Sequence, residues 1–442
     1  MEFARHKYDG NERRNLNYNS FLFSHHSHRH VSFYTFSFPS LAKYVNLVYN
    51  KDITFSEVLL QMKKLTVMSV FGTRPEAVKM APLVIELSKR PEINSICCVT
   101  AQHREMLDSV LDIFKVRPDY DLNIMTPNQT LATITTKALG GLDGVLSEAK
   151  PDIVLVHGDT STAFVSALAA FYHRIPVGHV EAGLRSFDKY SPFPEEMNRK
   201  LIGSIADLNF CPTNNNAENL RRENLNDGIF ITGNTVIDAL KYTVSDDYKF
   251  HNEDITKIDF DSYRTILMTA HRRENYGEPM RNIMHAVRDI VQSHPDVQVI
   301  YPVHMSPVVR ETVYEILGDA PRVHLLDPID VDDMHNLMAR AHFILTDSGG
   351  LQEEAPSLGK PVLVMRCETE RPEAVAAGTV KIAGVKREVI RDMACELLDN
   401  EEAYKKMAHA VNPYGDGNAS KRIADAILWK LAGIGDKPVD FK

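Results

Sequence analysis

The chain has 442 residues, and its 44% hydrophobic and 25% charged shares are ordinary for a soluble globular protein. This length predicts two or three domains. The net charge of −9 argues against broad nucleic-acid binding, and the sequence has no apolar run of the ~18 residues that a membrane-spanning helix needs. The five cysteines show no CxxC spacing, which indicates a reduced, cytoplasmic protein.

The N-terminal segment, residues 1–61, differs in composition from the rest of the chain. It is rich in His, Ser, Tyr, Phe, Asn and Arg and shows little periodicity, so we expect a disordered extension. The HHSHRH run at 25–30 belongs to a class of tract that sometimes binds metal, although we interpret it as part of the tail. The character changes at Met62, where MKKLTVMSVFGTRPEA has the pattern of a domain start. Deletion of residues 1–61 is therefore expected to leave activity intact.

Short apolar runs then alternate with helical patterns. Strands are expected at 65–71, 93–100, 152–158 and 175–182 and, after the pattern restarts, at 264–270, 297–303, 322–327, 342–347 and 360–365. Continuous apolar strands that alternate with amphipathic helices predict an α/β fold with parallel sheets covered on both faces. Two such units in series predict two Rossmann-like domains facing a cleft.

We expect the domain boundary near residues 232–236. It separates an N-terminal Rossmann-like domain, 62–235, from a C-terminal Rossmann-like nucleotide-binding domain, 236–414. A helix predicted within 415–434 is assigned to the first domain, packing back across it, although the pattern alone equally permits a helix that completes the second domain. Ligands of open α/β sheets bind beyond the carboxyl ends of the strands, so the loops after the strands are the candidate site.

The loop FILTDSGGLQEEAPSLG carries one set of candidates. Ser348, Gly349 and Gly350 lie between a buried strand and a helix, where glycines permit close backbone approach and helical N–H groups point at the loop. This pattern is typical of a diphosphate site, and Glu354 follows where it could accept hydrogen bonds from a ribose. A glycine turn with a capping serine is the alternative.

The loop FGTRPEAVKMAPL is its counterpart in the first domain. Arg74 and Lys79 flank a helix start, where positive side chains oppose the helix dipole. Their presence there makes sense if an anion is bound. The loop lacks the GxxxxGK[ST] spacing of a Walker A motif, which counts against ATP hydrolysis.

Acidic and basic residues follow other strands. The stretch HVEAGLRSFDKYSPFPEEMNRK, 179–200, is interpreted as a long charged loop that is either solvated or built around a substrate. Asp159 follows a strand in HGDTST, where it is either a helix cap or a site residue. His271 follows a strand in TAHRREN, where it is either a core residue or a site residue.

Taken together, GTRPEAVKMAPL, HGDTSTAF, GHVEAGLRS, PFPEEMNR, TAHRREN and DSGGLQEEAPSLGKPVL resemble the bacterial non-hydrolysing UDP-N-acetylglucosamine 2-epimerases. The resemblance covers about residues 62–431. It implies a glycosyltransferase-B-like fold and a homodimer. It also implies reversible C2 epimerisation of UDP-N-acetylglucosamine (UDP-GlcNAc) to UDP-N-acetylmannosamine (UDP-ManNAc), by UDP elimination to 2-acetamidoglucal and re-addition, for cell-surface polysaccharide precursors. No cofactor and no metal are implied.

The resemblance also implies residue roles. Acid/base or stabilising groups around the sugar are Asp159, Glu181, Glu195 and His271, and which of them takes the C2 proton stays open. The nucleotide-sugar contacts are Arg74, Lys79, Ser348, Gly349, Gly350 and Arg371, with Glu354 at the ribose, Ile329 and Met334 beside the uracil, and Arg199 near carboxylates or phosphate.

A second, activating substrate molecule binds beside the active site in some members. The matching positions are Gln102, Gln129, Glu196, Arg272 and His304. Glu105 and Asn128 depart from the pattern, where the family has Gln and Arg, so allosteric activation is an open hypothesis.

Three alternatives remain from the sequence. A hydrolysing epimerase would release UDP and free N-acetylmannosamine (ManNAc). A glycosyltransferase on the same fold is disfavoured by the acid cluster, and a catalytically silent nucleotide-sugar sensor is disfavoured by the presence of all four acid/base residues.

Overall fold

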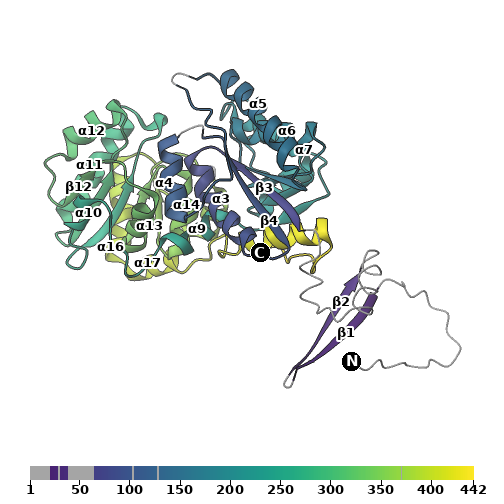
Figure 1. Cartoon of the computed structure of the whole chain (residues 1–442). Coiled ribbons are helices and arrows are strands. Elements are labelled where there is room, and N and C mark those ends of the chain that lie inside the picture. The colour runs from purple at the N-terminus through teal and green to yellow at the C-terminus, as the bar shows by residue number, and fades with distance from the viewer. Residues whose placement is uncertain (1–19, 28–29, 38–63, 102–103, 127–128, 370) are drawn as a thin grey trace.

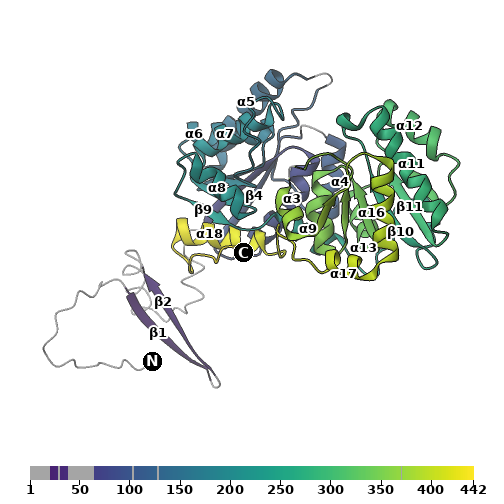
Figure 2. The ribbon, with the colours of Figure 1, turned by 180° about the vertical axis from the view of Figure 1, so that it is seen from behind.

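The computed structural model describes residues 20–27, 30–37, 64–101, 104–126, 129–369 and 371–442. Two parallel sheets form two domains that lie beside each other, the first mainly blue and the second mainly green in Figure 1 and, from behind, in Figure 2. The predicted α/β class with two Rossmann-like domains is confirmed.

The first domain contains a seven-stranded sheet in the order β5-β4-β3-β6-β7-β8-β9. Its strands are β3 (Leu65–Phe71), β4 (Ile93–Val99), β5 (Tyr120–Asp121), β6 (Ile153–His157), β7 (Val177–Val180), β8 (Leu208–Cys211) and β9 (Ile229–Ile231). Its helices are α3 (Arg74–Ser88), α4 (Arg104–Phe114), α5 (Leu131–Ala149), α6 (Ser161–Tyr172), α7 (Glu195–Ile205) and α8 (Asn214–Arg222). Helix α9 (Thr235–Thr243) begins at the predicted boundary and packs on the first domain, because Val236, Ile237 and Ala239 join its buried cluster.

The second domain contains a six-stranded sheet in the order β12-β11-β10-β13-β14-β15. Its strands are β10 (Arg264–Thr269), β11 (Val297–Pro302), β12 (Val323–Leu326), β13 (Phe343–Thr346), β14 (Val362–Val364) and β15 (Val380–Ile382). Its helices are α10 (Glu253–Thr256), α11 (Glu278–Ser293), α12 (Pro307–Leu317), α13 (Val331–Arg340), α14 (Gly349–Glu354), α15 (Pro372–Ala377), α16 (Arg387–Asp399) and α17 (Glu401–Ala408).

Strand β3 shows why the strands of this sheet have continuous apolar sequences. Val67 and Phe71 join a buried cluster with residues of α3 and α4, whereas Met68 and Val70 join a separate cluster with residues of α5 and α6. Successive side chains of a strand point to opposite faces of the sheet. Both faces are therefore buried under helices, as expected for a parallel sheet.

The last helix, α18 (Ala419–Ile427), lies on the first domain. Ile423 and Ile427 share a buried cluster with Leu83 and Leu87 of α3, and Figure 2 shows the helix in yellow beside this domain. The carboxylate of Asp238 on α9 accepts hydrogen bonds from the first N–H groups of the helix, at 2.8 and 3.1 Å. These contacts support our proposal that residues 415–434 belong with the first domain.

A short hairpin lies within the segment predicted to be disordered. Strands β1 (Ser20–Ser27) and β2 (His30–Ser37) pair antiparallel and form a sheet of their own. The structure differs from the sequence-based expectation here, because both strands are rich in aromatic, Ser and Thr residues and Phe, Tyr and Thr favour extended backbone. The rest of 1–61, including the remainder of the predicted disordered extension, lies outside the described residues.

The interpretation of 179–200 as one loop is wrong for its last part. Helix α7 begins at Glu195, and Glu195 and Glu196 occupy its first turn. Acidic residues are favoured at that position by the positive end of the helix dipole. The charge run thus includes a helix start as well as a loop.

Candidate active site

The loops that follow the strands of both domains approach each other across the domain boundary. Arg74 at the start of α3 donates a hydrogen bond from Nη2 to the backbone oxygen of Ile329, at 3.1 Å. Two residues predicted to contact the substrate from different domains are thereby in direct contact. Ile329 is buried, and Met334, predicted to lie with it beside the uracil, is half-buried against the same apolar cluster.

Glu76 fixes the turn between β3 and α3. Its buried carboxylate accepts the N–H groups of Gly72 and Thr73, at 3.0 and 2.8 Å, and the hydroxyl of Thr160, at 2.6 Å. Burial raises the pKa of Glu76, and these hydrogen bonds lower it only in part. The turn that presents Arg74 is therefore tied to the turn after β6. We did not single out Glu76 from the sequence, although the spacing Thr-x-x-Glu is the signal of a capping box.

Glu181 lies directly after β7 with a left-handed backbone (φ 63°). Its carboxylate accepts a hydrogen bond from Lys79 Nζ, and its Oε2 lies 2.9 Å from His157 Nε2. Burial raises the pKa of this carboxyl, but the positive charge of Lys79 and the imidazole of His157 outweigh burial and hold it well below its ordinary value. His157, which the sequence reasoning missed, ends the strand two residues before Asp159.

Asp159 is held by two residues of α7. Arg199 Nη2 lies 2.6 Å from its carboxylate, and Asn198 Nδ2 donates to its backbone oxygen at 2.8 Å. Arg199 also reaches Glu196, at 3.2 Å, whose buried carboxylate accepts the N–H groups of Ser186 and Phe187. The two predicted residues Asp159 and Arg199 are therefore in contact, and Glu196 anchors the preceding loop.

Glu195 has a different environment. It is half-buried, and its Oε2 is buried without a hydrogen-bond partner among the described residues. A buried carboxylate oxygen without a partner is costly unless a ligand supplies a donor. This acid is therefore available to a bound molecule.

Asp347 organises the second-domain side of the site. The Oδ2 of this fully buried residue accepts the N–H groups of His271 and Arg272, both at 2.8 Å, and Asn275 Nδ2 at 3.0 Å. The ring of His271 stacks on that of His304, with centroids 5.4 Å apart. Burial lowers the pKa of His271, and Asp347 offsets part of this effect, so the imidazole is neutral near pH 7.

Two guanidinium groups reach the glycine turn after β13. A Cβ placed on Gly349 would lie 3.7 Å from Arg371 Nη2 and 3.9 Å from Arg272 Nη2. Arg371 also donates a hydrogen bond to Glu353, and burial, which by itself lowers the pKa of Arg371, is outweighed by that carboxylate, so the pKa is raised. The turn of Ser348, Gly349 and Gly350 is thus lined by permanent cations, a suitable setting for an anion.

Glu354 lies one turn further along and faces His335, whose Nε2 is 3.2 Å from its Oε2. The other ring nitrogen of His335 is 2.7 Å from Thr243 Oγ1. The carboxylate is therefore oriented, and it lies at the glycine turn, because a Cβ on Gly350 would lie 3.0 Å from its Oε1.

The residues predicted for a second substrate molecule are placed only in part. His304, Arg272 and Glu196 adjoin the site residues described above. Gln129 accepts the N–H of Thr126 at 3.4 Å. Gln102 and Asn128 lie outside the described residues, as does the side chain of Glu105.

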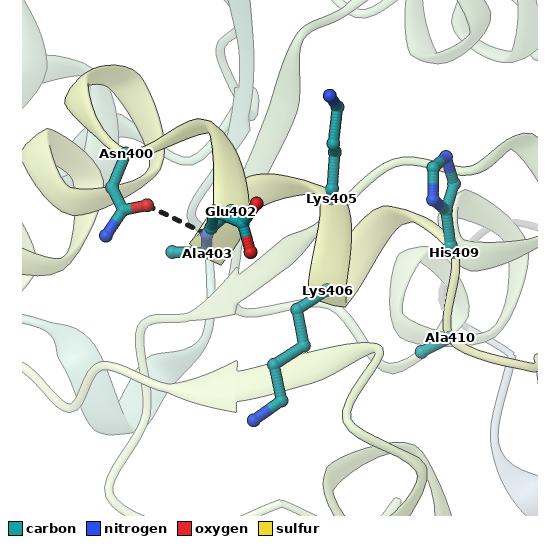
Figure 3. A pocket seen from close by; sticks show the side chains of 7 residues that line it. All are labelled: Asn400, Glu402, Ala403, Lys405, Lys406, His409 and Ala410. Atoms are coloured by element: carbon teal, nitrogen blue, oxygen red, sulfur yellow. Dashed lines mark hydrogen bonds between the residues drawn. The ribbon is translucent and has the colours of Figure 1, made fainter.

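Two hollows in the surface differ in whether they adjoin the predicted site residues. A cavity of about 370 Å³ borders the site and is lined by residues of both domains, including Arg185, Arg371 and Tyr414. A larger hollow of about 620 Å³ on α17 contains none of the predicted site residues. Figure 3 shows Lys405 and Lys406 pointing away from each other there, while Asn400 caps the helix by accepting the N–H of Ala403 at 3.1 Å. The α17 hollow is therefore no convergent site.

Within the described part of the chain, no group of three or more His, Cys, Asp and Glu residues is arranged to hold a metal ion. In the same residues, no helix has both the length and the apolar character that a membrane crossing requires.

The fold and the site together define an enzyme of glycosyltransferase-B-like architecture with a cation-lined turn where the two domains meet. A family model described as UDP-N-acetylglucosamine 2-epimerase matches residues 85–428. The chain belongs to this family, a family of isomerases.

Individual relatives support this family assignment. A Bacillus subtilis (strain 168) protein named UDP-N-acetylglucosamine 2-epimerase is 59% identical over 381 residues, which cover 86% of this chain and 99% of that protein. A crystal structure of a UDP-N-acetylglucosamine 2-epimerase is 57% identical, with a TM-score of 0.80, and the match covers 86% of this chain and all of that one. The Neisseria meningitidis enzyme bound to UDP-GlcNAc is 49% identical, with a TM-score of 0.76 and coverage of 82% and 100%.

Proposed function

We propose that the chain is a non-hydrolysing epimerase that interconverts UDP-GlcNAc and UDP-ManNAc. One observation carries the proposal: the Glu181 carboxylate of the first domain lies near Arg371, which lines the glycine turn of the second. Glu181 and Arg371, which lie on opposite sides of the domain boundary, interact electrostatically. A nucleotide sugar whose diphosphate lies at the turn would place its sugar among the acids, and the Neisseria relative is bound to such a molecule, UDP-GlcNAc.

The chemistry begins at the diphosphate. Inversion at C2 requires removal of a hydrogen that is not next to a carbonyl, so direct deprotonation is poor. When UDP leaves C1 with the bonding electron pair, the oxocarbenium-like centre makes the C2 proton acidic. Arg74, Lys79 and Arg371 stabilise the departing charge, with the Ser348–Gly350 turn, because cations placed where charge develops favour the transition state.

Acid/base groups then act at C2. One of Asp159, Glu181, Glu195 and His271 takes the proton, and 2-acetamidoglucal remains in the site with UDP. Protonation from the other face, with return of UDP to C1, gives the epimer. Arg199 balances the charge of Asp159, Glu354 binds the ribose, and Ile329 and Met334 flank the uracil. The scheme uses no cofactor.

Product analysis tests this function. Phosphorus and proton NMR of the full chain with UDP-GlcNAc, without added metal or nicotinamide cofactor, should show UDP-ManNAc at equilibrium and little free UDP. Equal amounts of UDP and free ManNAc would instead establish a hydrolysing epimerase. Unchanged substrate, with binding shown by calorimetry, would indicate a sensor or a transferase that lacks its acceptor.

The second-substrate site is part of the same proposal. We assign Gln102, Gln129, Glu196, Arg272 and His304 to it. Sigmoidal dependence of the rate on UDP-GlcNAc concentration is expected if a second molecule activates the enzyme. Hyperbolic dependence at all concentrations would remove this assignment.

A homodimer, a cytoplasmic location and a role in cell-surface polysaccharide precursors complete the proposal. Phe171 and Tyr172 at the end of α6 are exposed and adjacent, and Leu201 is exposed on α7, which packs against α6; we assign the contact with a partner copy to these apolar side chains. Light scattering after size exclusion should give about twice the chain mass, and replacement of Phe171 and Tyr172 by Ser should give the monomer.

A further inference from the structure

Four charged side chains from both domains meet in the cleft. In the first domain Lys79 contacts Glu181, and in the second Arg371 contacts Glu353, which also accepts Asn234 Nδ2 at 2.8 Å. Glu353 and Arg371 both act electrostatically on Lys79, and Glu181 acts on Arg371. The cluster therefore contains two cations and two anions that compensate one another across the domain boundary.

This compensation conflicts with the proposed chemistry. Lys79 is expected to stabilise a diphosphate, yet its ammonium group is in contact with Glu181. A carboxylate that accepts a hydrogen bond from a buried ammonium group is a weak base, because the cation stabilises its ionised form. Glu181 and Lys79 cannot both perform their proposed roles while they remain paired.

We propose that Lys79 exchanges partners during the reaction: it holds Glu181 in the empty site and turns to the diphosphate as UDP departs, which frees Glu181 to take the C2 proton. This inference rests on the proposed function. It assigns the proton-abstracting role to Glu181 and an activating role to Lys79.

The exchange orders the two bond-breaking steps. When the C1–O bond breaks, its electron pair stays on the β-phosphate oxygen, and UDP gains one negative charge that attracts Lys79. The C2–H bond then breaks, its electron pair forms the C1=C2 double bond of the glycal, and the proton goes to the Glu181 carboxylate. His157, whose Nε2 lies 2.9 Å from that carboxylate, remains beside it when Lys79 turns away. Premature proton loss is thereby avoided.

The other ionisable groups near Glu181 do not substitute for Lys79. His157 on β6 remains beside it, and His179 on β7 is held by the backbone oxygen of Gly158, at 2.7 Å. From the second domain Arg371 is engaged with Glu353. Among the described residues, Lys79 is thus the cation in direct contact with Glu181.

Calorimetric titration with UDP alone tests the exchange without turnover. Proton uptake is obtained from the dependence of the binding enthalpy on the ionisation enthalpy of the buffer, between about pH 5 and 7, where a carboxyl with a raised pKa titrates. The full chain should take up more protons on binding UDP than its isosteric control Glu181→Gln, because the pKa of Glu181 rises when Lys79 leaves it. In the Lys79→Gln background, adding Glu181→Gln should leave the proton uptake on UDP binding unchanged.

Equal proton uptake by the full chain and Glu181→Gln would overturn the exchange. If UDP-ManNAc is nevertheless formed, the proposed function stands, whereas absence of UDP-ManNAc removes both.

Discussion

At the residue scale, single buried groups position the reactive ones. Asp347 accepts hydrogen bonds from the backbone N–H groups of His271 and Arg272. Glu76 does comparable work in the first domain, where it accepts three hydrogen bonds. A buried carboxylate with several donors fixes a loop more firmly than an exposed ion pair does, because each unmet donor would cost ~1–3 kcal/mol.

Asp347→Asn should slow the reaction. The amide keeps one oxygen that can accept the same three donors, but it removes the negative charge that raises the pKa of His271, so that pKa should fall further. We expect kcat/KM to decrease by about 10- to 100-fold, equivalent to ~1–3 kcal/mol, and the limb assigned to His271 to move to lower pH. The matched control is Asp289→Asn, which removes an ion pair with Arg387 elsewhere in the domain and should leave the pH profile unchanged.

His179 predicts how stability depends on pH. Burial lowers its pKa from about 6.5 to about 4, so the unfolded chain binds a proton more readily. Stability is therefore complete above pH 6.5 and declines as pH falls toward 4, by up to about 3 kcal/mol over that window. Urea unfolding at a series of pH values should show a shallower decline for His179→Gln, which retains a donor for the Gly158 oxygen. An unchanged slope would show that other groups dominate.

At the scale of elements, the sequence predicts the parts whose signal is local. The apolar run at 65–71 coincides with β3, and the runs at 297–303 and 342–347 match β11 and β13 to within one residue at each end. Helix α7 was interpreted as loop because two prolines and many charges precede and begin it. Helix α5 was not singled out, since its glycines and threonines weaken the helical pattern.

For the candidate site, too, the sequence predicts one part and not the other. Candidate residues could be found because chemistry lies at strand ends, and Arg74, Asp159, Glu181 and His271 all follow strands. Their pairings could not be found, because contacts such as that between Lys79 and Glu181 join residues about a hundred positions apart. Strand order, rather than any local motif, determines such contacts.

Glu76→Gln tests how the two first-domain turns are coupled. The amide keeps one acceptor oxygen but presents a donor to N–H or hydroxyl groups, so the free energy of unfolding should fall by ~1–3 kcal/mol. Glu86→Gln, which weakens an ion pair with Arg90 near the end of the same helix, should change it by less than about 1 kcal/mol. Denaturant unfolding measures both, and equal effects would refute the special role of Glu76.

At the scale of the whole molecule, contacts between the domains hold the cleft in the observed arrangement. Glu373 on α15 accepts hydrogen bonds from Thr213 and Asn215 of the first domain, at 3.2 and 3.0 Å, and from Tyr414, at 3.2 Å. The final helix and the tail reinforce the link, since Phe441 N–H donates to the oxygen of Ile231 on the edge strand β9, at 2.8 Å. Both domains are thus connected by chain segments and side chains.

Glu373→Ala should favour a more open cleft. Loss of these contacts is expected to raise the Kd for UDP by about 3- to 10-fold, because hydrogen bonds of this kind contribute ~0.5–1.5 kcal/mol each. Small-angle scattering should report a larger radius of gyration for the free variant, and calorimetry the weaker binding. Glu388→Ala on the surface of α16 is the control. An unchanged radius with unchanged affinity would contradict this role for Glu373.

The most direct measurement of the central claim is proton NMR of the C2 position during turnover in deuterated water. We predict that UDP-ManNAc forms with deuterium at C2 and that the remaining UDP-GlcNAc also acquires deuterium, because the proton on the acid/base groups exchanges with solvent. UDP-ManNAc that keeps the original hydrogen at C2 throughout would contradict proton removal by exchanging side chains and with it the proposed mechanism.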